Sequence, residues 1–245
     1  MKERQRRILD RVEEKGKVSV QELARLSGVS GVTIRKDLAE LESRHYLSRA
    51  HGYAVSLNDL SERVSSNFTL KEAMAKRALS LLEEGDTLFI EAGSSNAHFA
   101  REIGRAGLDV TVVTPCVYVA NELKNSYQEV VLIGGVLQKR SECLVGPLTH
   151  LCINQINFNK VFIGIDGYHP DYGFTGRDIM RAENIRLAIE KGVQNFVIAE
   201  STKFGKLFPY NVAKHSDIDT VITDAGLLLS VETTLTEHGI RLLKA

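Results

Sequence analysis

The sequence of 245 residues has no long apolar run and only three cysteines. No run approaches the roughly 20 apolar residues that a membrane-spanning helix needs, so we expect no membrane partner. The stretch Met-Lys-Glu-Arg-Gln-Arg-Arg at the N-terminus has no apolar segment behind it, which argues against a secretory signal. Cys116, Cys143 and Cys152 form neither a C-x-x-C pair nor a zinc-ligand spacing, and such a sparse, odd count is typical of a reducing compartment. The sequence therefore predicts a cytoplasmic globular protein without a metal site.

The sequence also lacks net charge, because 31 Lys and Arg are balanced by 31 Asp and Glu. The balance is uneven along the chain. Residues 1–55 hold 12 basic and 8 acidic residues, a local charge of +4, and the remainder therefore carries −4. A basic head on an acidic body indicates that only the head approaches a polyanion. Chance scatter produces similar values over a segment of this length, so charge alone decides little.

Three helices are predicted in the head. Residues 4–14 place apolar side chains on one helical face and arginines on the other. Ser19 can cap a second helix, with Glu22 at the capping-box spacing, and Gly28 ends that helix. Ser30 can cap a third helix immediately after a short turn. A helix, a short glycine-containing turn and a further helix form the helix-turn-helix pattern.

The third predicted helix has one polar and one apolar face. Thr33, Arg35 and Lys36 supply donors for bases and phosphates. Ile34 and Leu38 recur at helical spacing and can face a core. A helix of this kind fits the major groove, where its N-terminal residues contact the base edges. We therefore interpret it as a candidate DNA-reading helix.

A short segment after the helices, residues 46–55, has strand-like residues around a glycine and predicts a two-stranded wing. Arg49 and His51 lie where they could touch the DNA backbone or the minor groove. Trios of short basic helices also serve as protein-interaction modules, so this pattern alone leaves both interpretations open.

The head resembles the DeoR-type winged helix-turn-helix domain. The resemblance rests on the signature formed by Arg4, Ile8, Val12, Ser30, Thr33, Ile34, Arg35, Lys36, Asp37 and Leu38. It implies an N-terminal winged helix-turn-helix domain over residues 1–57 that binds double-stranded operator DNA. The residues expected to contact DNA are Ser19, Ser30, Val32, Thr33, Arg35, Lys36, Arg49 and His51. Gly31 departs from the family, which often has an acidic or polar residue at this position.

The polar segment of residues 58–68 lacks sustained periodicity and is interpreted as a linker, with a frayed helix as the alternative. Strands and helices alternate over residues 69–245, which predicts an α/β domain with a mainly parallel sheet flanked by helices. The expected strands are 87–91, 110–114, 130–133, 160–165, 196–199, 220–223 and 240–243. The expected helices are 69–84, 95–104, 116–124, 144–156, 179–191 and 230–238.

Glycine, hydroxyl and charged residues follow these predicted strands. Ligands of such sheets bind at the carboxyl ends of the strands. Glycines allow backbone N–H groups to approach an anion, and Lys203 adds a point charge suited to phosphate. The sequence has neither a G-x-G-x-x-G nor a Walker lysine motif, so a dinucleotide or nucleoside triphosphate has little support. We expect a small polar ligand that bears a phosphate.

The same loops resemble the sensor domain of the DeoR family, which is similar to ribose-5-phosphate isomerase. The resemblance rests on a Gly-Ser-Ser turn, a Gly-Gly pair, Gly164-x-Asp166-Gly167, Gly-Phe-Thr and Ser-Thr-Lys-Phe-Gly. It implies that the ligand is a phosphorylated sugar or sugar alcohol. The expected effector-binding residues are Gly93, Ser94, Ser95, Thr114, Gly134, Gly135, Asp166, Gly167, Thr175 and Lys203. Glu91 and Pro115 depart from the family, which commonly has Asp and Asn there. Cys116 beside these loops is expected to be buried and inert.

Two functions are compatible with these features. The first is a transcriptional regulator, in particular a repressor, that has no cofactor and forms a dimer or tetramer on a repeated or palindromic operator. The second is a sugar-phosphate isomerase with an accessory head, for which Asp166, Asp178 or Glu183 could supply the carboxylate base. We favour the regulator, because an enzyme has no use for a DNA-reading head.

Overall fold

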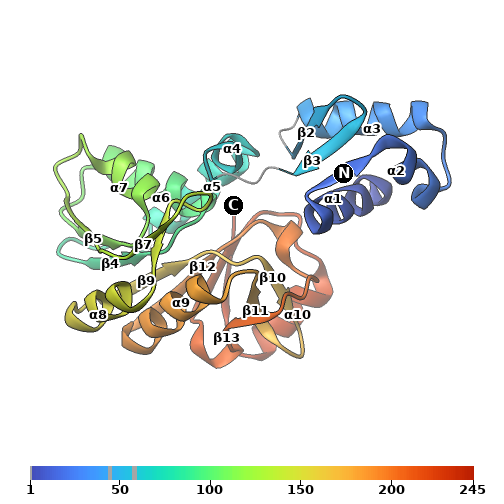
Figure 1. The fold of residues 1–245 in the computed structure, drawn as a ribbon. Helices are drawn as coiled ribbons and strands as arrows, with labels where there is room; N and C mark the ends of the chain where they lie inside the picture. The colour runs from blue at the N-terminus through green and yellow to red at the C-terminus, as the bar shows by residue number, and fades with distance from the viewer. Residues whose placement is uncertain (1, 44–45, 57–59) are drawn as a thin grey trace. The chain divides into compact units, whose positions relative to one another are not determined.

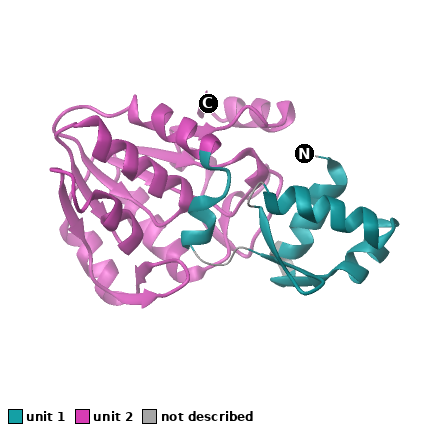
Figure 2. Ribbon diagram, turned by 90° about the horizontal axis from the view of Figure 1, so that it is seen from above, with its two compact units in different colours: residues 1–68 teal, residues 69–245 magenta. Residues whose placement is uncertain are grey.

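The computed structural model describes residues 2–43, 46–56 and 60–245, and the chain divides into two compact units, Met1–Phe68 and Thr69–Ala245 (Figure 2). Residues 57–59, where we expected the head to end and the linker to begin, lie outside the described residues. The rest of the expected linker contains a short helix, α4 (Leu60–Ser65). Across the described ranges, no helix combines the length and the apolar character that crossing a membrane requires.

The first unit contains the three predicted helices, α1 (Glu3–Lys15), α2 (Val20–Ser27) and α3 (Gly31–Ser43). The wing consists of β2 (Leu47–Ala50) and β3 (Tyr53–Ser56), which pair antiparallel. A third strand, β1 (Lys17–Ser19), adds to the other side of β3 and was not predicted. The short segment between α1 and α2 has only three strand residues, which is too short for an alternating pattern to be recognised.

One apolar core holds the first unit together. It includes Ile8 of α1, Leu23 of α2, Ile34 and Leu38 of α3, and Ala54 of the wing, all of which are almost fully buried. Burying a side chain of this size contributes about 1.5–3 kcal/mol relative to leaving it exposed. The periodic apolar residues of the three helices therefore face each other, and the polar faces remain available.

The second unit is built on a sheet of seven parallel strands in the order β15-β14-β12-β9-β4-β5-β6 (Figure 1). These are the seven strands predicted from the sequence: β4 (Thr87–Ile90), β5 (Thr111–Thr114), β6 (Glu129–Leu132), β9 (Lys160–Ile163), β12 (Gln194–Ile198), β14 (Thr220–Thr223) and β15 (Arg241–Lys244). The five central strands, β14, β12, β9, β4 and β5, have apolar residues at their middle positions and are mostly buried, as expected for strands covered on both faces. The predicted α/β fold is confirmed.

Helices pack on the sheet. They are α5 (Phe68–Leu79), α6 (Ser94–Ala106), α7 (Val117–Leu123), α8 (Pro147–Gln155), α9 (Ile179–Lys191) and α10 (Leu229–Glu237). Alternate strand residues face different helices. Phe89 and Val161 belong to a core shared with α8, α9 and α10. Phe162 points the other way and packs on Phe99 of α6 with ring centroids 4.5 Å apart. Both faces of the sheet are therefore covered.

Five short strands outside the main sheet were not predicted. β7 (Val136–Gln138) and β8 (Cys143–Val145) form a hairpin, and β10 (Gly167–His169), β11 (Gly173–Gly176) and β13 (Tyr210–Ala213) form a small antiparallel sheet. The predicted helix 144–156 begins only at Pro147, which occupies the first turn, because its first residues pair in β8.

A buried ion pair lies at the amino end of β9. Lys160 Nζ donates to Asp86 Oδ2 at 2.6 Å, and Asn159 Nδ2 donates to Asp86 Oδ1 at 2.5 Å. Asp86 and Lys160 are each 5% exposed. Burial raises the pKa of Asp86, but hydrogen bonds from Lys160, the Glu83 amide and Asn159 outweigh burial, so the net pKa is lowered. The pair fixes the loop before β4 to the start of β9.

Replacing Asp86 by Asn is expected to lower the free energy of unfolding at pH 7 by about 3–5 kcal/mol, because it leaves a buried, unpaired ammonium. In the wild type, the lowered pKa of the folded state contributes stability that is complete above the ordinary value of 3.8. That stability is lost as the pH falls through the lowered pKa. Urea unfolding at pH 7 and pH 3 measures both effects. Equal pH dependence in the two proteins would contradict this role of Asp86.

Candidate functional site

The start of α3 forms an exposed polar surface above a buried apolar face. Ser30 Oγ accepts the Thr33 N–H at 3.2 Å and lies 3.0 Å from Thr33 Oγ1, so Ser30 caps the helix as predicted from its position. Arg35 and Lys36 are exposed, whereas Ile34 on the opposite face is fully buried. The predicted division of this helix into a donor face and a core face is therefore present.

Val32 adds an apolar contact to this surface. Its side chain is 72% exposed in the first turn of α3, although a valine usually packs inside a domain. An exposed methyl group at this position can contact a thymine methyl in the major groove. Val32, Arg35 and Lys36 together offer one apolar and two cationic contacts from a single turn.

A pair missed by sequence reasoning holds α3 against α1. Arg4 Nε donates to Asp37 Oδ2 at 2.6 Å and Arg4 Nη2 to Asp37 Oδ1 at 3.2 Å, and Asp37 is only 2% exposed. Bidentate guanidinium–carboxylate pairs fix orientation as well as distance. Both residues belong to the family signature quoted above, but they are 33 positions apart, so the sequence does not predict that they contact each other. The pair fixes the rotation of α3, and hence the direction of its exposed side chains.

The wing turns through His51 and Gly52, both with positive φ (43° and 85°), in a two-residue hairpin loop. Arg49, a predicted DNA contact, donates from Nε to Glu42 Oε2 at 2.5 Å, and its backbone N–H donates to Glu42 Oε1. Ser19 Oγ accepts the Glu22 N–H and caps α2. Arg49 and Ser19 therefore make contacts within the first unit, while His51 is exposed at the wing tip.

Replacing Arg35 by Ala is expected to cost about 1–3 kcal/mol of specific operator binding, because it removes a direct contact to a base edge. Binding to unrelated DNA should change much less. Fluorescence anisotropy with the chain's own upstream DNA and with scrambled DNA of equal length measures both. Arg241→Ala, an exposed change in β15, is the matched control. Unchanged operator affinity and sequence preference in the Arg35 variant would contradict the assignment of α3.

The predicted effector loops follow the carboxyl ends of the strands of the seven-stranded sheet, and these ends form one edge of the sheet. The strand order reverses between β4 and β9. From β4 the chain adds β5 and β6 on one side, and it then returns to add β9, β12, β14 and β15 on the other side. In open parallel sheets, ligands bind outside the carboxyl ends of the strands at this switch point. The loop that begins with Glu91 follows β4, and the loop that begins with Gly164 follows β9. The predicted residues of these two loops therefore adjoin the switch point.

Glu91 and Arg181 form a buried ion pair at the switch point. Arg181 Nη2 donates to Glu91 Oε1 at 2.5 Å and to the Ala92 carbonyl at 2.7 Å, and Gly164 N–H donates to Glu91 Oε2 at 3.2 Å. Burial raises the pKa of Glu91, partly offset by Arg181, and the carboxylates of Glu91 and Asp166 raise the pKa of Arg181 despite its burial. Sequence reasoning missed Arg181, because it lies 90 positions after Glu91.

Asp166 is ionised at the same edge. Its Oδ2 accepts the Arg177 N–H at 2.9 Å. Burial acts to raise the pKa of Asp166, but the charges of Arg181 and Lys203 outweigh it and keep the pKa below its usual value. Lys203 therefore lies close enough to Asp166 to act on it electrostatically. An ionised acceptor and an ammonium at one sheet edge suit a ligand with both hydroxyl groups and a negative charge.

The start of α6 supplies backbone donors to this edge. Gly93 occupies the N-cap position and makes no side-chain cap, and Ser94 and Ser95 form the first turn of a 13-residue helix. The first N–H groups of a helix have no intrahelical acceptor, and the helix dipole favours an anion there. Gly93 and Ser94 are partly exposed, whereas Ser95 is 8% exposed.

Four other predicted effector residues have structural contacts. Thr114 Oγ1 donates to the Ile90 carbonyl at 2.6 Å and accepts the Cys116 N–H, and it is fully buried. Thr175 Oγ1 accepts the Phe208 N–H at 3.2 Å and is also fully buried. A Cβ on Gly167 would lie 2.4 Å from the Lys206 carbonyl oxygen, and one on Gly135 would lie 2.0 Å from Thr149 Oγ1. Each of these residues has a packing or hydrogen-bonding role independent of any ligand.

Alanine variants of the adjacent residues Gly134 and Gly135 distinguish a packing role from a ligand-binding role. We expect Gly135→Ala to destabilise the second unit by roughly 1–3 kcal/mol through overpacking. The reason is the clash with Thr149 and a φ of 153°. Gly134→Ala has nothing within 4 Å of the new Cβ and should leave stability nearly unchanged. Thermal denaturation of the two variants tests this difference, and equal melting temperatures would contradict it.

Cys116 is fully buried, and burial raises its pKa to about 12. A thiol with so high a pKa is almost entirely protonated at neutral pH, as expected for an inert cysteine. Within the described part of the chain, no three His, Cys, Asp or Glu residues are placed to hold a metal ion.

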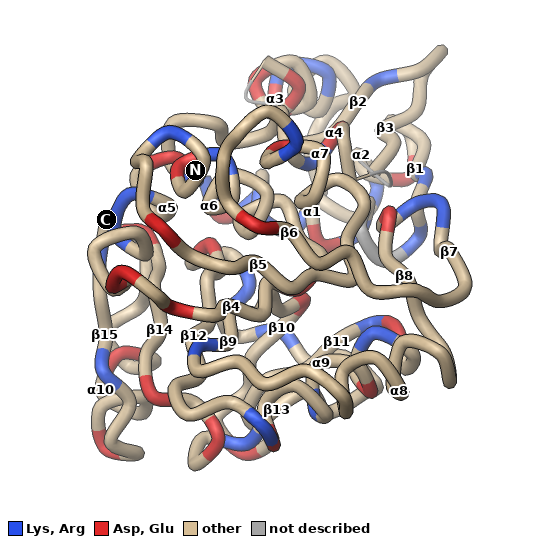
Figure 3. Tube along the Cα trace, turned by 90° about the vertical axis from the view of Figure 1, so that its left-hand side faces the viewer, with Lys and Arg blue, Asp and Glu red and all other residues tan. Residues whose placement is uncertain are grey.

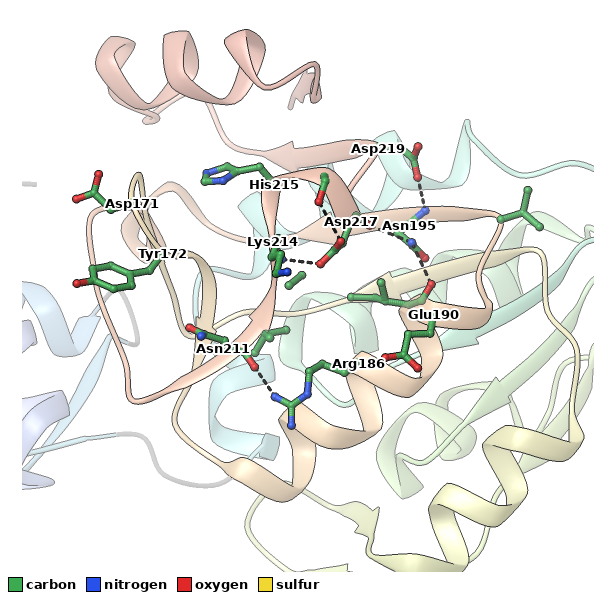
Figure 4. Close-up of a pocket in the computed structure, with 15 residues that line it drawn as sticks. Asp171, Tyr172, Arg186, Glu190, Asn195, Asn211, Lys214, His215, Asp217 and Asp219 are labelled. Carbon is green, nitrogen blue, oxygen red and sulfur yellow. Dashed lines mark hydrogen bonds between the residues drawn. The ribbon is translucent and has the colours of Figure 1, made fainter.

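A separate hollow of about 870 Å³ lies at the amino ends of β12 and β14, between α9 and the loop after β13 (Figure 4). None of the predicted effector residues line it. Several of its polar groups make internal contacts: Asp219 accepts the Asn195 N–H, Asp217 accepts the Lys214 N–H, and Arg186 donates to the Asn211 carbonyl. The lining of the hollow has both signs of charge, with Arg186 and Lys214 beside four acidic residues, Asp171, Glu190, Asp217 and Asp219. Over the second unit as a whole, Lys and Arg are interspersed with Asp and Glu (Figure 3).

Comparisons with known proteins match both units. A family model described as a DeoR-like helix-turn-helix domain matches residues 4–59, and one described as a DeoR C terminal sensor domain matches residues 66–225. The HTH-type transcriptional regulator FruR of Bacillus subtilis is 34% identical over 229 residues, 91% of each chain. GlpR of Haloferax volcanii is 33% identical over 231 residues, 92% of this chain and 90% of that protein.

Comparison with solved structures gives matches at low sequence identity. The ribose 5-phosphate isomerase A of Methanocaldococcus jannaschii is 17% identical, with a TM-score of 0.43 over 57% of this chain and 55% of that chain. The translation initiation factor eIF-2B of Pyrococcus horikoshii is 13% identical, with a TM-score of 0.50 over 87% of this chain and 80% of that chain.

Proposed function

Because the chain belongs to the DeoR family of helix-turn-helix transcriptional regulators, we propose that it represses a sugar or sugar-alcohol operon and is controlled by a phosphorylated sugar. The head binds operator DNA in the cytoplasm. The sheet edge at the switch point binds the effector. Effector binding changes operator affinity only if the effector binds the two states of the regulator unequally.

The observation that carries this proposal is the meeting of an ammonium, an ionised carboxylate and a helix N-terminus at one sheet edge. Lys203 and the first-turn amides of α6 suit a phosphate. Asp166 suits the hydroxyl groups of a sugar or polyol, because its lowered pKa keeps it an acceptor at neutral pH. Ser94 adds a hydroxyl at the start of the helix. No cofactor is part of the proposal.

Relatives support the class of effector. One relative, 29% identical over 223 residues, is the lactose phosphotransferase system repressor of Staphylococcus epidermidis. Another, 27% identical over 250 residues, is a putative aga operon transcriptional repressor of Escherichia coli O157:H7. Both names describe repressors, and the first describes a repressor of sugar uptake.

The isomerase alternative is not supported. The close relatives are regulators, and the likeness to isomerases is one of fold alone. The three candidate bases also have other contacts. Asp178 caps α9 and accepts a hydrogen bond from Gln138, Asp166 accepts the Arg177 N–H, and Glu183 lies 3.9 Å from His150. The relatives therefore favour a regulator over an isomerase.

A dimer or tetramer completes the proposal. One recognition helix contacts only a few base pairs, so operator specificity requires two heads on a repeated or palindromic site. Symmetry of the protein then matches symmetry of the operator.

Replacing Lys203 by Ala is expected to weaken effector binding roughly 10- to 100-fold, the effect of losing one charged hydrogen bond, while operator binding stays unchanged. Thermal shift with fructose 1-phosphate, glucose 6-phosphate, ribose 5-phosphate and glycerol 3-phosphate identifies the binder, because a ligand of the folded state raises the melting temperature. Anisotropy then measures release from DNA.

Lys214→Ala is the matched control, because Lys214 is an exposed lysine that lines the hollow at the opposite sheet edge. It should leave effector affinity unchanged. If Lys214→Ala abolishes binding and Lys203→Ala does not, the effector site is the hollow and the switch-point assignment is wrong. If no phosphorylated sugar of the panel binds the wild type, the proposed effector class fails.

A further inference from the structure

A lysine ammonium is buried in the first helix of the second unit. Lys71 lies in α5 and its side chain is 1% exposed. Its Nζ lies 3.3 Å from Glu200 Oε1, and the Glu200 side chain is 11% exposed. A buried charge of this kind costs several kcal/mol of desolvation, which only good pairing offsets. A well-packed apolar pair would hold α5 at least as well, so stability alone does not account for an ion pair at this position.

Glu200 begins the turn that carries Lys203. It is the N-cap residue of the 3-10 turn Ser201–Lys203, and its carbonyl accepts the Lys203 N–H at 2.9 Å. The other side of this turn is anchored, because Ser201 donates to Asp224 from its N–H at 2.6 Å and from its Oγ at 2.7 Å. Glu200 and Lys203 are therefore held in one hydrogen-bonded turn, three positions apart.

Lys71 lies close in sequence to the head. The helix α5 begins at Phe68, the residue at which the first unit ends, and Lys71 is three positions later. The helix face that carries Lys71 is packed, because Met74, Ala75 and Ala78, three, four and seven positions later on the same face, are fully buried. A shift at Lys71 therefore changes the start of a rigid element rather than a free chain.

We propose that Lys71 is a positioning residue that couples the effector turn to the helix leading from the head. The inference rests on the proposed function and names how that site regulates DNA binding. A phosphate on Lys203 redistributes charge around the Ser201–Lys203 turn and shifts Glu200 relative to Lys71. The ion pair transmits this shift to α5. Effector binding and head release are thereby linked through two side chains, neither of which contacts the effector or the DNA.

The test replaces both charges at once. Single removal of either partner breaks the buried ion pair and destabilises the fold, whereas the double variant Lys71→Met with Glu200→Leu removes both charges of the pair and keeps similar volume. It should bind the operator within about twofold of the wild type and bind the sugar phosphate of the panel within about threefold. Release of the double variant from DNA should require a sugar-phosphate concentration at least about tenfold higher than release of the wild type, within the usual 5- to 150-fold range of allosteric coupling.

Two variants separate coupling from packing. Lys71→Arg retains a cation that can pair with Glu200, and it should restore release to within about threefold of the wild type. Lys76→Met removes a lysine from the same helix that is 59% exposed and paired only at the surface with Glu72, and it should change nothing. A purely structural role of Lys71 would lower stability in the double variant without changing the effector concentration needed for release.

Hydrogen exchange with inorganic phosphate as the probe tests the link without knowledge of the effector. Phosphate should slow exchange in residues 200–205 and in residues 68–79 of the wild type, but only in residues 200–205 of the double variant. Protection confined to residues 200–205 in the wild type would overturn the coupling and leave the proposed function intact. Protection of neither segment would instead contradict the anion site, and with it the proposed function. Normal effector release from the double variant would also overturn the coupling.

Discussion

The buried contact between Glu91 and Arg181 organises the switch point of the sheet. Arg181 extends from the first turn of α9 to the end of β4, and Gly164 at the end of β9 donates to the same carboxylate. The helix that places Arg181 is itself capped by Asp178, which accepts a hydrogen bond from Gln138 of the β7–β8 hairpin. One guanidinium thus connects two central strands, a helix and a hairpin. Losing one partner would leave the other charged and buried, at a cost of about 3–5 kcal/mol.

The same contact sets the electrostatics of the effector edge. Arg181 is committed to Glu91, so it neutralises that carboxylate, yet its charge still lowers the pKa of neighbouring Asp166. The charge of Lys203 also lowers the pKa of this aspartate, and Lys203 belongs to a turn that Asp224 holds in place. The edge therefore has its acceptor and its cation positioned before a ligand arrives. Groups that are already oriented lose less entropy on binding, so a small charged ligand can be bound with useful affinity.

The sequence predicted the seven sheet strands because most are short runs rich in Val, Ile or Phe between helices. The strands β7, β8, β10, β11 and β13 were not predicted, because each has only three or four residues, too few to show alternation, and they are stabilised by their pairing partners. The same limit applies to the site. Lys203 and Thr114 were both predicted to bind the effector because each lies at or after the end of a strand. Only the folded structure shows that the Thr114 hydroxyl donates to the Ile90 carbonyl instead. Arg181 and Lys71 escaped because their partners lie 90 and 129 positions away.

The two units differ in how charge is used, and this difference explains how one chain can bind two anions. In the head, Arg4 and Asp37 lock α3 in place while Arg35 and Lys36 stay exposed for DNA, a long polyanion that many weak contacts can hold. In the second unit, the pair formed by Glu91 and Arg181 lies inside the sheet end rather than on the surface, which suits a small ligand that offers few contacts, each of which must be precisely placed. Charges in a partly buried site are screened less by water and salt than exposed charges are. The charges of Arg181 and Lys203 therefore still act on Asp166 and keep its pKa below its usual value.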